Sequence, residues 1–208
     1  MQLIGQFDSP FVRRVGIALK LYALPFEHLP FSTFGEGDRF VQHNPLRRVP
    51  TLVLDDGTAL VDSAAILDHL DEVHGRDRAL IPAAGAERRA ALQRIALATG
   101  TADKAVSFFY ARLFSQSLDP AFSQRCEDQI RAGLGALDAL CAARPDDWWH
   151  GQGPGHDDVA VACVTRFLFE AYSHLINPGD YPGLAAHSAR AEALSVFREI
   201  SQPFIPPS

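Results

Sequence analysis

Three short motifs in this sequence carry residues whose types and spacing could do chemistry: a Ser-Pro pair at Ser9, a Val-Pro pair at Val49 and an Asp-Ser pair at Asp62. A proline amide adopts the cis state at a cost of only about 0.5 to 1 kcal/mol. If the bond after Val49 is cis, the N–H and C=O of Val49 can turn outward and pair with an extended peptide. Such a peptide would lie beside the helix that begins after Ser9, which indicates a peptide-binding site.

Each motif also has a simpler interpretation. Ser followed by Pro is what any helix start prefers, and Asp62 with Ser63 is a helix cap that suits the helix dipole. Taken alone, Ser9 and the Asp62 pair are therefore better explained as caps. Three independent motifs rarely coincide in the right strand, helix and hairpin context, so together they favour a binding site.

The first motif opens a predicted amphipathic helix. Apolar residues recur there at intervals of three and four, while Arg13, Arg14 and Lys20 fall elsewhere on the helical wheel. The pattern predicts a small α/β domain whose first two strands are parallel and whose last two are antiparallel. In order, we expect a strand over Gln2–Phe7, a helix over Pro10–Tyr22, a strand over Phe26–Leu29, a hairpin of Thr51–Leu54 and Thr58–Val61, and a helix from Asp62 or Ser63 to Gly75.

The second part of the chain has a different period. From Glu87 onward the apolar spacing is helical almost to the C-terminus. The predicted fold is an α/β N-terminal domain followed by an all-α helical C-terminal domain. We expect helices over 87–116, 120–143 and 157–173, with shorter ones after Pro182. The pattern predicts domain limits of 1–79 and 88–208, joined by a linker over 80–87.

Composition argues against several functional classes. The net charge of -6 opposes the phosphate contacts of a nucleic-acid-binding protein. No stretch approaches the ~20 apolar residues of a membrane span, and the first residues lack a secretory-signal pattern, so we expect a soluble, cytoplasmic protein. Cys126, Cys141 and Cys163 are too widely separated for a disulfide framework or a zinc site. The eight histidines show no close metal-ligand grouping, so we expect no metal.

The quoted motifs resemble those of a known family. Ser9–Arg14 (SPFVRR), Asn44–Pro50 (NPLRRVP) and Asp62–Ile66 (DSAAI) are similar to the successive glutathione-site motifs of the cytosolic glutathione transferases. Trp148–Gly151 and Asp158–Ala162 resemble the start of the core helix in that family's C-terminal domain, so the likeness covers nearly the whole chain. It implies a thioredoxin-like N-terminal domain and a serine-type, bacterial-like member.

The resemblance also implies a role for each site residue. Ser9 stands where serine-type members place the hydroxyl that hydrogen-bonds the glutathione sulfur. Arg48 matches a residue that reaches the glycyl end of glutathione. Val49, before the family's cis proline, would pair with the cysteinyl backbone, while Asp62 and Ser63 would receive the γ-glutamyl group. Glutathione is thus the implied co-substrate.

Two positions depart from the family pattern. Arg47 stands where relatives often have Gly, so it could alter access to the glycyl end of the pocket. Gly155 replaces the Ser or Thr cap three residues ahead of Asp158, which weakens the expected capping box. Asp157 or His156 could compensate.

Thiol chemistry explains why a hydroxyl at Ser9 would matter. A free cysteine thiol has a pKa near ~8.5, whereas the nucleophile is the thiolate. Half ionisation near pH 7 requires a shift of about 1.5 pKa units, or roughly 2 kcal/mol in favour of the charged form. A hydroxyl hydrogen bond to a charged acceptor contributes ~1.5 to 3 kcal/mol, and a helix N-terminus ~0.3 to 1. Ser9 should therefore donate a hydrogen bond rather than lose its proton.

Three functions follow from this resemblance. The first is a transferase that conjugates the glutathione thiolate to an electrophilic, hydrophobic co-substrate, as a homodimer in which Asp103 contacts the γ-glutamyl amine across the interface. The second is a non-catalytic module of the same fold that acts through a protein partner. The third, a glutathione-dependent disulfide reductase, needs an attacking cysteine where the chain has Ser9, so we rank it low.

Overall fold

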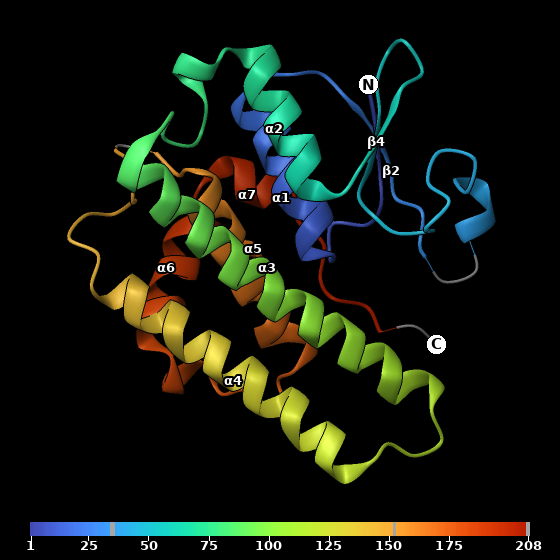
Figure 1. Ribbon diagram of the computed structural model, residues 1–208, viewed down its shortest axis with the longest axis vertical. Coiled ribbons are helices and arrows are strands. Elements are labelled where there is room, and N and C mark those ends of the chain that lie inside the picture. The colour runs from blue at the N-terminus through green and yellow to red at the C-terminus, as the bar shows by residue number, and fades with distance from the viewer. Residues whose placement is uncertain (34–35, 152, 207–208) are drawn as a thin grey trace. The chain divides into compact units, whose positions relative to one another are not determined.

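The structure is a computed structural model that describes residues 1–33, 36–151 and 153–206. The chain packs as two compact units, one formed by 1–83 with 192–208 and the other by 84–191 (Figure 1). The predicted domain limits of 1–79 and 88–208 stay a prediction, and the packing adds that the C-terminal segment lies with the first unit. In the described part of the chain, no helix is long and apolar enough to span a membrane.

The first unit contains a four-stranded mixed sheet in the order β2-β1-β3-β4. β1 pairs parallel to β2 and antiparallel to β3, and β3 pairs antiparallel to β4, which confirms the predicted α/β arrangement. The register aligns Ile4, Thr51 and Val61 across three neighbouring strands. The strands are β1 (Gln2–Ile4), β2 (Glu27–Leu29), β3 (Thr51–Val53) and β4 (Ala59–Val61).

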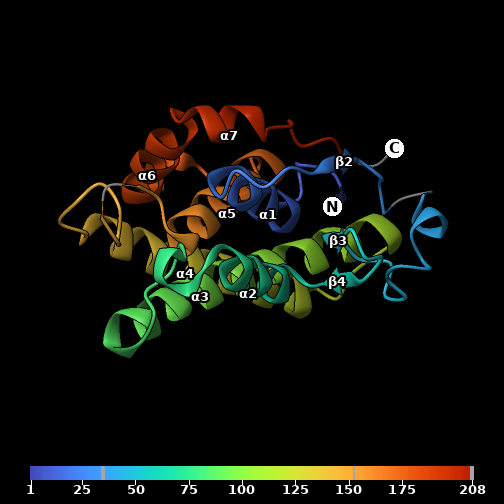
Figure 2. The same ribbon diagram turned by 90° about the horizontal axis from the view of Figure 1, so that it is seen from above.

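Helices α1, α2 and α7 lie together on one side of the strands, and α1 packs between the other two (Figure 2). Leu19, Leu52 and Ile66 are fully buried in the core that these helices form with the sheet. Two short 3-10 turns, η1 (Gly37–Arg39) and η2 (Arg76–Arg78), complete this unit. The helices are α1 (Pro10–Leu21), α2 (Ser63–His74) and α7 (Ser195–Glu199).

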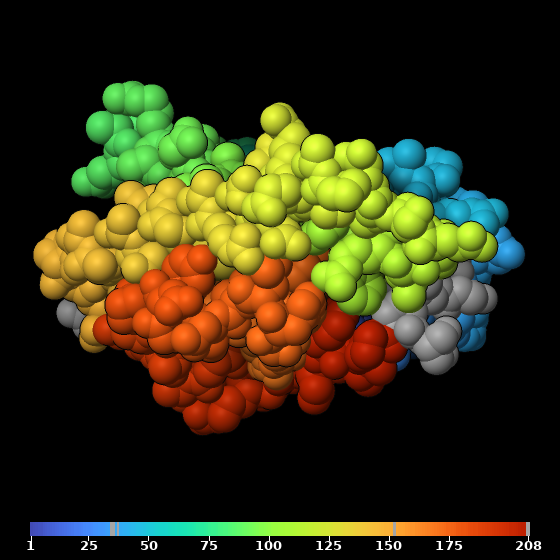
Figure 3. Space-filling view, turned by 90° about the horizontal axis from the view of Figure 1, so that it is seen from below, coloured from blue at the N-terminus to red at the C-terminus, as the bar shows by residue number. Residues whose placement is uncertain are grey.

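The second unit is entirely helical, as predicted. Helix α3 packs against both α4 and α5, and α5 is buried along most of its length. A Cβ on Gly133 of α4 would lie 2.1 Å from Oγ1 of Thr101 on α3, so the two helices approach closely. Figure 3 shows α4 and α6 exposed on one face. The elements are α3 (Gly85–Phe114), α4 (Pro120–Ala142), α5 (His156–Ala171), η3 (Pro178–Asp180) and α6 (Pro182–Glu192).

Candidate functional site

The three motifs lie along one edge of the sheet in the first unit. Gly5 follows the last residue of β1, Pro50 precedes the first residue of β3, and Asp62 follows the last residue of β4. Each is one residue beyond the aligned set Ile4, Thr51 and Val61, so the three lie at the same end of neighbouring strands. Helix α1 follows the end of β1, and α2 follows the end of β4 directly. Both helix N-termini therefore lie at this edge, where their unpaired N–H groups carry partial positive charge.

Gly5 joins two of the motifs through a close approach. Its φ is +126°, and a Cβ there would lie 2.5 Å from Cγ2 of Val12 and 2.8 Å from Cβ of Val49. Val12 belongs to the first turn of α1, so Val49 lies against the turn that leads to Ser9. The peptide-pairing motif and the helix start are thus part of one packed site.

The loop before Pro50 is held by a buried amide. Asn44 is 1% exposed, and its Nδ2 donates to the carbonyl of Arg48 at 2.7 Å and to Oγ1 of Thr51 at 3.0 Å. The Val49-Pro50 bond is cis, which confirms the geometry expected from the sequence. Within residues 1–33, 36–151 and 153–206, the N–H and C=O of Val49 make no hydrogen bond, so both are available to a peptide.

Ser9 is the N-cap of α1. Its Oγ accepts from the N–H of Val12 at 3.4 Å, a long hydrogen bond that leaves the hydroxyl hydrogen available for donation. The side chain is partly exposed, and the first turn of α1 contains no acidic residue. An anion beside Ser9 would therefore meet a hydroxyl donor and a positive helix end without a competing carboxylate in that turn.

Asp62 and Ser63 form the start of α2. Asp62 adopts φ +71° and ψ 131°, a conformation that costs a non-glycine residue about 1–3 kcal/mol. Its Oδ1 accepts from the N–H of Ala64 at 2.8 Å, so it caps the helix. Ser63 is 4% exposed. The cap interpretation and the ligand interpretation of this pair are compatible, because the other amides of the first turn still face the same sheet edge.

Comparison with known proteins identifies the family. Residues 3–78 match the model of the glutathione S-transferase N-terminal domain, and residues 120–190 match that of the C-terminal domain. The uncharacterised GST-like protein YibF of Escherichia coli K12 is 32% identical over 171 residues, which are 81% of this chain and 82% of that protein. This chain belongs to the glutathione S-transferase family.

Two solved structures share the complete fold. A glutathione S-transferase from Methylobacterium radiotolerans, in complex with glutathione sulfonate, is 28% identical and has a TM-score of 0.88, with 100% of this chain and 98% of that chain covered. The holo structure of a maleylpyruvate isomerase, a bacterial glutathione S-transferase of the Zeta class, is 26% identical with a TM-score of 0.78, covering 97% and 96% of the two chains. One fold in this family thus serves more than one reaction.

The other residues that the family resemblance singled out lie in different places. Arg48 is exposed in the loop before Pro50. Asp103 is exposed on α3 of the second unit. The roles of Ser9, Arg48, Val49, Asp62, Ser63 and Asp103 toward glutathione stay predictions.

Cysteines and metal ligands do not contribute to this edge. Cys126, Cys141 and Cys163 are buried in helices of the second unit and form no disulfide with one another. Burial raises the pKa of the Cys141 thiol to about 12, so it is not a nucleophile at neutral pH. Among the residues that the structure describes, no group of three or more His, Cys, Asp or Glu side chains could hold a metal ion.

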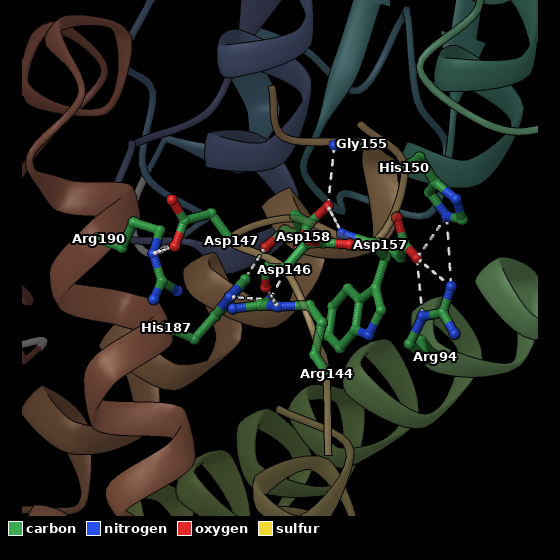
Figure 4. Close-up of polar contacts among 11 residues, drawn as sticks. Arg94, Arg144, Asp146, Asp147, His150, Gly155, Asp157, Asp158, His187 and Arg190 are labelled. Atoms are coloured by element: carbon green, nitrogen blue, oxygen red, sulfur yellow. Dashed lines mark hydrogen bonds and ion pairs between the residues drawn. The ribbon is translucent and has the colours of Figure 1, made fainter. Parts of the chain in front are cut away.

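A buried polar network surrounds the N-terminus of α5 in the second unit (Figure 4). Asp157 is fully buried and pairs with Arg94 at 2.7 Å and with Nε2 of His150 at 2.9 Å. Asp158, also fully buried, accepts from the N–H of Gly155 at 3.1 Å. The half of the capping box that Asp158 supplies is therefore present although the cap residue is a glycine.

His187 of α6 completes this network. Its Nδ1 lies 2.8 Å from Nη1 of Arg144 and its Nε2 lies 3.0 Å from the carbonyl of Asp158. Since Arg144 can only donate, Nδ1 accepts and Nε2 carries the hydrogen, so the imidazole is neutral. Burial lowers the pKa of His187 to about 4, and the charge of Arg144 acts in the same direction.

The sequence analysis identified the Asp158 motif but not its partners. Arg94, Arg144 and His187 come from three separate segments, and a single arginine or histidine carries no signal in the sequence of what it will contact. Burial raises the pKa of Asp158 to about 7, with the neighbouring charge of Asp157 adding to the shift. Because these groups pair with one another, their arrangement explains the packing of α5 rather than a reaction.

Proposed function

We propose that this chain binds glutathione at the sheet edge of the first unit and conjugates its thiolate to an electrophilic, hydrophobic co-substrate. The observation that carries the proposal is the convergence of three motifs, with two helix N-termini, on that edge. Ser9 is the residue proposed to stabilise the thiolate, which makes this a serine-type member of the family.

The dimensions of the edge suit a tripeptide. An extended tripeptide spans about 10 Å, and neighbouring strands lie about 4.8 Å apart, so the edge from Gly5 to Asp62 is of similar length. In the proposed pose, Val49 pairs with the cysteinyl main chain and Arg48 binds the glycyl carboxylate. Ser63 and the first amides of α2 receive the γ-glutamyl carboxylate, because a helix N-terminus stabilises an anion.

The proposed reaction begins with ionisation of the bound thiol. The proton passes to solvent, and the Ser9 hydroxyl donates a hydrogen bond to the sulfur anion. That bond contributes about 1.5 to 3 kcal/mol, and the N-terminus of α1 adds about 0.3 to 1. The thiolate then forms a carbon–sulfur bond with the electrophile, whose leaving group departs with the bonding electron pair.

Ser9→Ala tests this role. The variant should raise the pKa of the bound thiol and slow conjugation, because the sulfur anion loses its hydroxyl donor while the main-chain pairing remains. We expect a loss of about 10- to 100-fold in kcat, the equivalent of one charge-assisted hydrogen bond, with little change in glutathione affinity. A conjugation assay with a generic aryl halide, run across pH, measures both effects. Equal activity of the variant and the parent at every pH would remove Ser9 from the mechanism.

Binding without turnover is the outcome that favours the second hypothesis, a non-catalytic module acting through a protein partner. Titration calorimetry with glutathione reports binding without depending on the position of either tryptophan. A panel of electrophiles, with maleylpyruvate as an isomerisation substrate, reports turnover. Conjugation, isomerisation and binding alone are thus separated by one set of assays.

The resemblance to the family supports two further proposals, a homodimer and a cytoplasmic location with a role in detoxification. For the dimer, the mass in solution should be twice the 22.7 kDa of one chain. Light scattering after size-exclusion chromatography measures it directly.

A further inference from the structure

His28 of β2 contacts the turn that leads from β1 to Ser9. Its Nε2 lies 2.7 Å from the carbonyl oxygen of Gly5. Its ring stacks on Phe7, with centroids 3.8 Å apart and planes 13° from parallel. The next residue of the same strand, Leu29, accepts a hydrogen bond from the N–H of Gly5 at 2.9 Å. Strand β2 therefore holds both main-chain polar groups of Gly5, one through its backbone and the other through the His28 side chain.

Gly5 and Phe7, the two residues that His28 contacts, each pack against helix α1. Gly5 lies against Val12 of α1 and against Val49, as the 2.5 and 2.8 Å approaches of a Cβ built on it show. Phe7 is 8% exposed, and its Cε1 would lie 2.9 Å from a Cβ on Gly16 of α1. A shift of either residue would therefore move the start of α1 relative to Val49.

We propose that His28 is a positioning residue of the glutathione site. It fixes the turn from Gly5 to Ser9, and thereby the separation between Ser9, whose hydroxyl donates to the thiolate, and Val49, which pairs with the peptide. This inference rests on the proposed function. His28 does not touch the sulfur in this account. It acts through Gly5 and Phe7, so its loss misplaces the hydroxyl rather than removing it.

The hydrogen bond sets a condition on the imidazole. A carbonyl can only accept, so Nε2 must carry a hydrogen, which both the imidazolium and one neutral tautomer supply. The contact with Gly5 therefore needs an N–H donor at this position, a property that an amide side chain can reproduce.

A pair of amide variants isolates the hydrogen bond. The amide nitrogen of His28→Gln can reach the place of Nε2, whereas that of His28→Asn is one carbon short, and both lose the ring stack. Phe7→Leu removes the stack and keeps the hydrogen bond. His174→Asn, at an exposed histidine of the second unit, is the matched control.

The readouts are the pKa of the bound glutathione thiol, from thiolate absorbance of the binary complex, and the separate values of kcat and KM. For His28→Asn we expect a rise of that pKa by roughly one unit and a loss of about ten-fold in kcat/KM, the scale of a misplacement below 1 Å. His28→Gln should recover most of the loss. Phe7→Leu should fall between the two, and His174→Asn should match the parent.

Failure of the positioning role and failure of the proposed function give different results. If the parent binds glutathione with a lowered thiol pKa that Ser9→Ala raises, the proposed function holds. His28→Asn with an unchanged thiol pKa and KM, or with a lower melting temperature as its only defect, then overturns the positioning role. Equal losses in His28→Gln and His28→Asn overturn the role of the hydrogen bond. A parent that does not bind glutathione at all overturns both proposals.

Discussion

At the residue scale, Gly5 shows how tightly the site is built. Its positive φ favours glycine, and its two nearest neighbours belong to two of the three motifs, Val12 beside the Ser9 cap and Val49 before Pro50. Any side chain at Gly5 would separate α1 from Val49. We therefore expect substitution there to affect both stability and glutathione affinity.

Gly5→Ala should lower the free energy of unfolding by about 1–2 kcal/mol for the backbone conformation and by roughly 1–3 kcal/mol more for overpacking. Gly57→Ala is the matched control, because Gly57 also has a positive φ, +86°, but has no atom within 4 Å of a built Cβ. Urea unfolding of both variants measures the two terms separately. Equal losses in the two would show that the close approach at Gly5 carries no cost.

The candidate site residues that the sequence suggests are those with a local signal. Ser9 and Asp62 precede the first residues of two helices and Val49 precedes a proline, so a few consecutive residues identify each of them as a candidate. His28 has no such signal, since a histidine within a short strand resembles any other polar strand residue. Its contact with Gly5 depends on the parallel pairing of β1 with β2, which only the fold supplies.

At the element scale, α1 differs from its expected pattern. Arg13 and Arg14 fall outside the apolar stripe of the helical wheel, yet each is 2% exposed. For Arg13 the reason is α7 and the residue after it, which pack against α1 and contact this side chain. Arg13 donates to both carboxylate oxygens of Glu192 at 2.6 and 2.8 Å and to the carbonyls of Phe197 and Ile200. Periodicity reveals that a face is polar, but not that a segment far along the chain will cover it.

Arg13→Met should therefore be strongly destabilising. It removes the guanidinium that donates to Glu192 and to two carbonyls, at a cost of about 3 kcal/mol, the lower end for breaking a buried pair, because the Glu192 side chain is 27% exposed. Lys20→Met is the control on the same helix. Lys20 pairs with Glu199, and these side chains are 45% and 56% exposed, so its loss should cost about 0–1 kcal/mol. Denaturant midpoints at constant m-value compare the stabilities of the two variants. Similar losses would contradict the stabilising role of the Arg13 contacts with Glu192, Phe197 and Ile200.

The buried network at the start of α5 should make the stability of the protein depend on pH. The folded pKa of His187 is about 4 against 6.5 for the free group, so between these values the unfolded chain binds a proton that the folded one does not. Its contribution to stability is fully present above about pH 6.5 and is lost as the pH falls toward 4. Asp158 acts in the opposite sense. Its pKa is about 7 in the folded chain against 3.8 for the free group, so its contribution to stability falls as the pH rises through that range.

His187→Phe separates the two contributions. The variant should be less stable at pH 7 by roughly 1–3 kcal/mol, because Arg144 and the Asp158 carbonyl lose a partner. The difference in unfolding free energy between the parent and the variant should shrink as the pH falls from 6.5 to 4, since phenylalanine has no proton to bind. Unfolding free energies from urea titrations at several pH values test this, with exposed His174→Phe as the control. A pH-independent difference between variant and parent would show that His187 is not held neutral.

At the scale of the whole molecule, the sequence predicted the order of elements and the change from mixed α/β to helical structure. It did so because strand and helix periods differ and each short connection carries its own turn residues. The packing of the C-terminal segment with the first unit was not predicted, since nothing local marks α7 as belonging to residues 1–83. How two chains would assemble is also outside what periodicity reports, and the proposed dimer rests on the family.

The role proposed for Asp103 gives the dimer a functional test. If Asp103 of one subunit contacts the γ-glutamyl amine bound to the other, Asp103→Ala should weaken glutathione binding by about ten-fold, the scale of a charge-assisted hydrogen bond. Each mutant homodimer, Ser9→Ala or Asp103→Ala, then has a defect in both of its sites. A mixed dimer gathers both defects in one site and leaves the other with Ser9 from one chain and Asp103 from the second chain intact.

Mixing the two variants under conditions that exchange subunits should therefore restore activity above that of either variant alone. The expected activity per chain approaches a quarter of the parent's, because half of the dimers are mixed and one of the two sites in each mixed dimer is intact. A mixture of each variant with itself, treated in the same way, is the control for refolding and exchange. Conjugation rate at limiting glutathione is the measurement, because the Asp103 defect lies in binding. Activity that stays at the average of the two homodimers would contradict a contact across the interface, whatever the mass in solution.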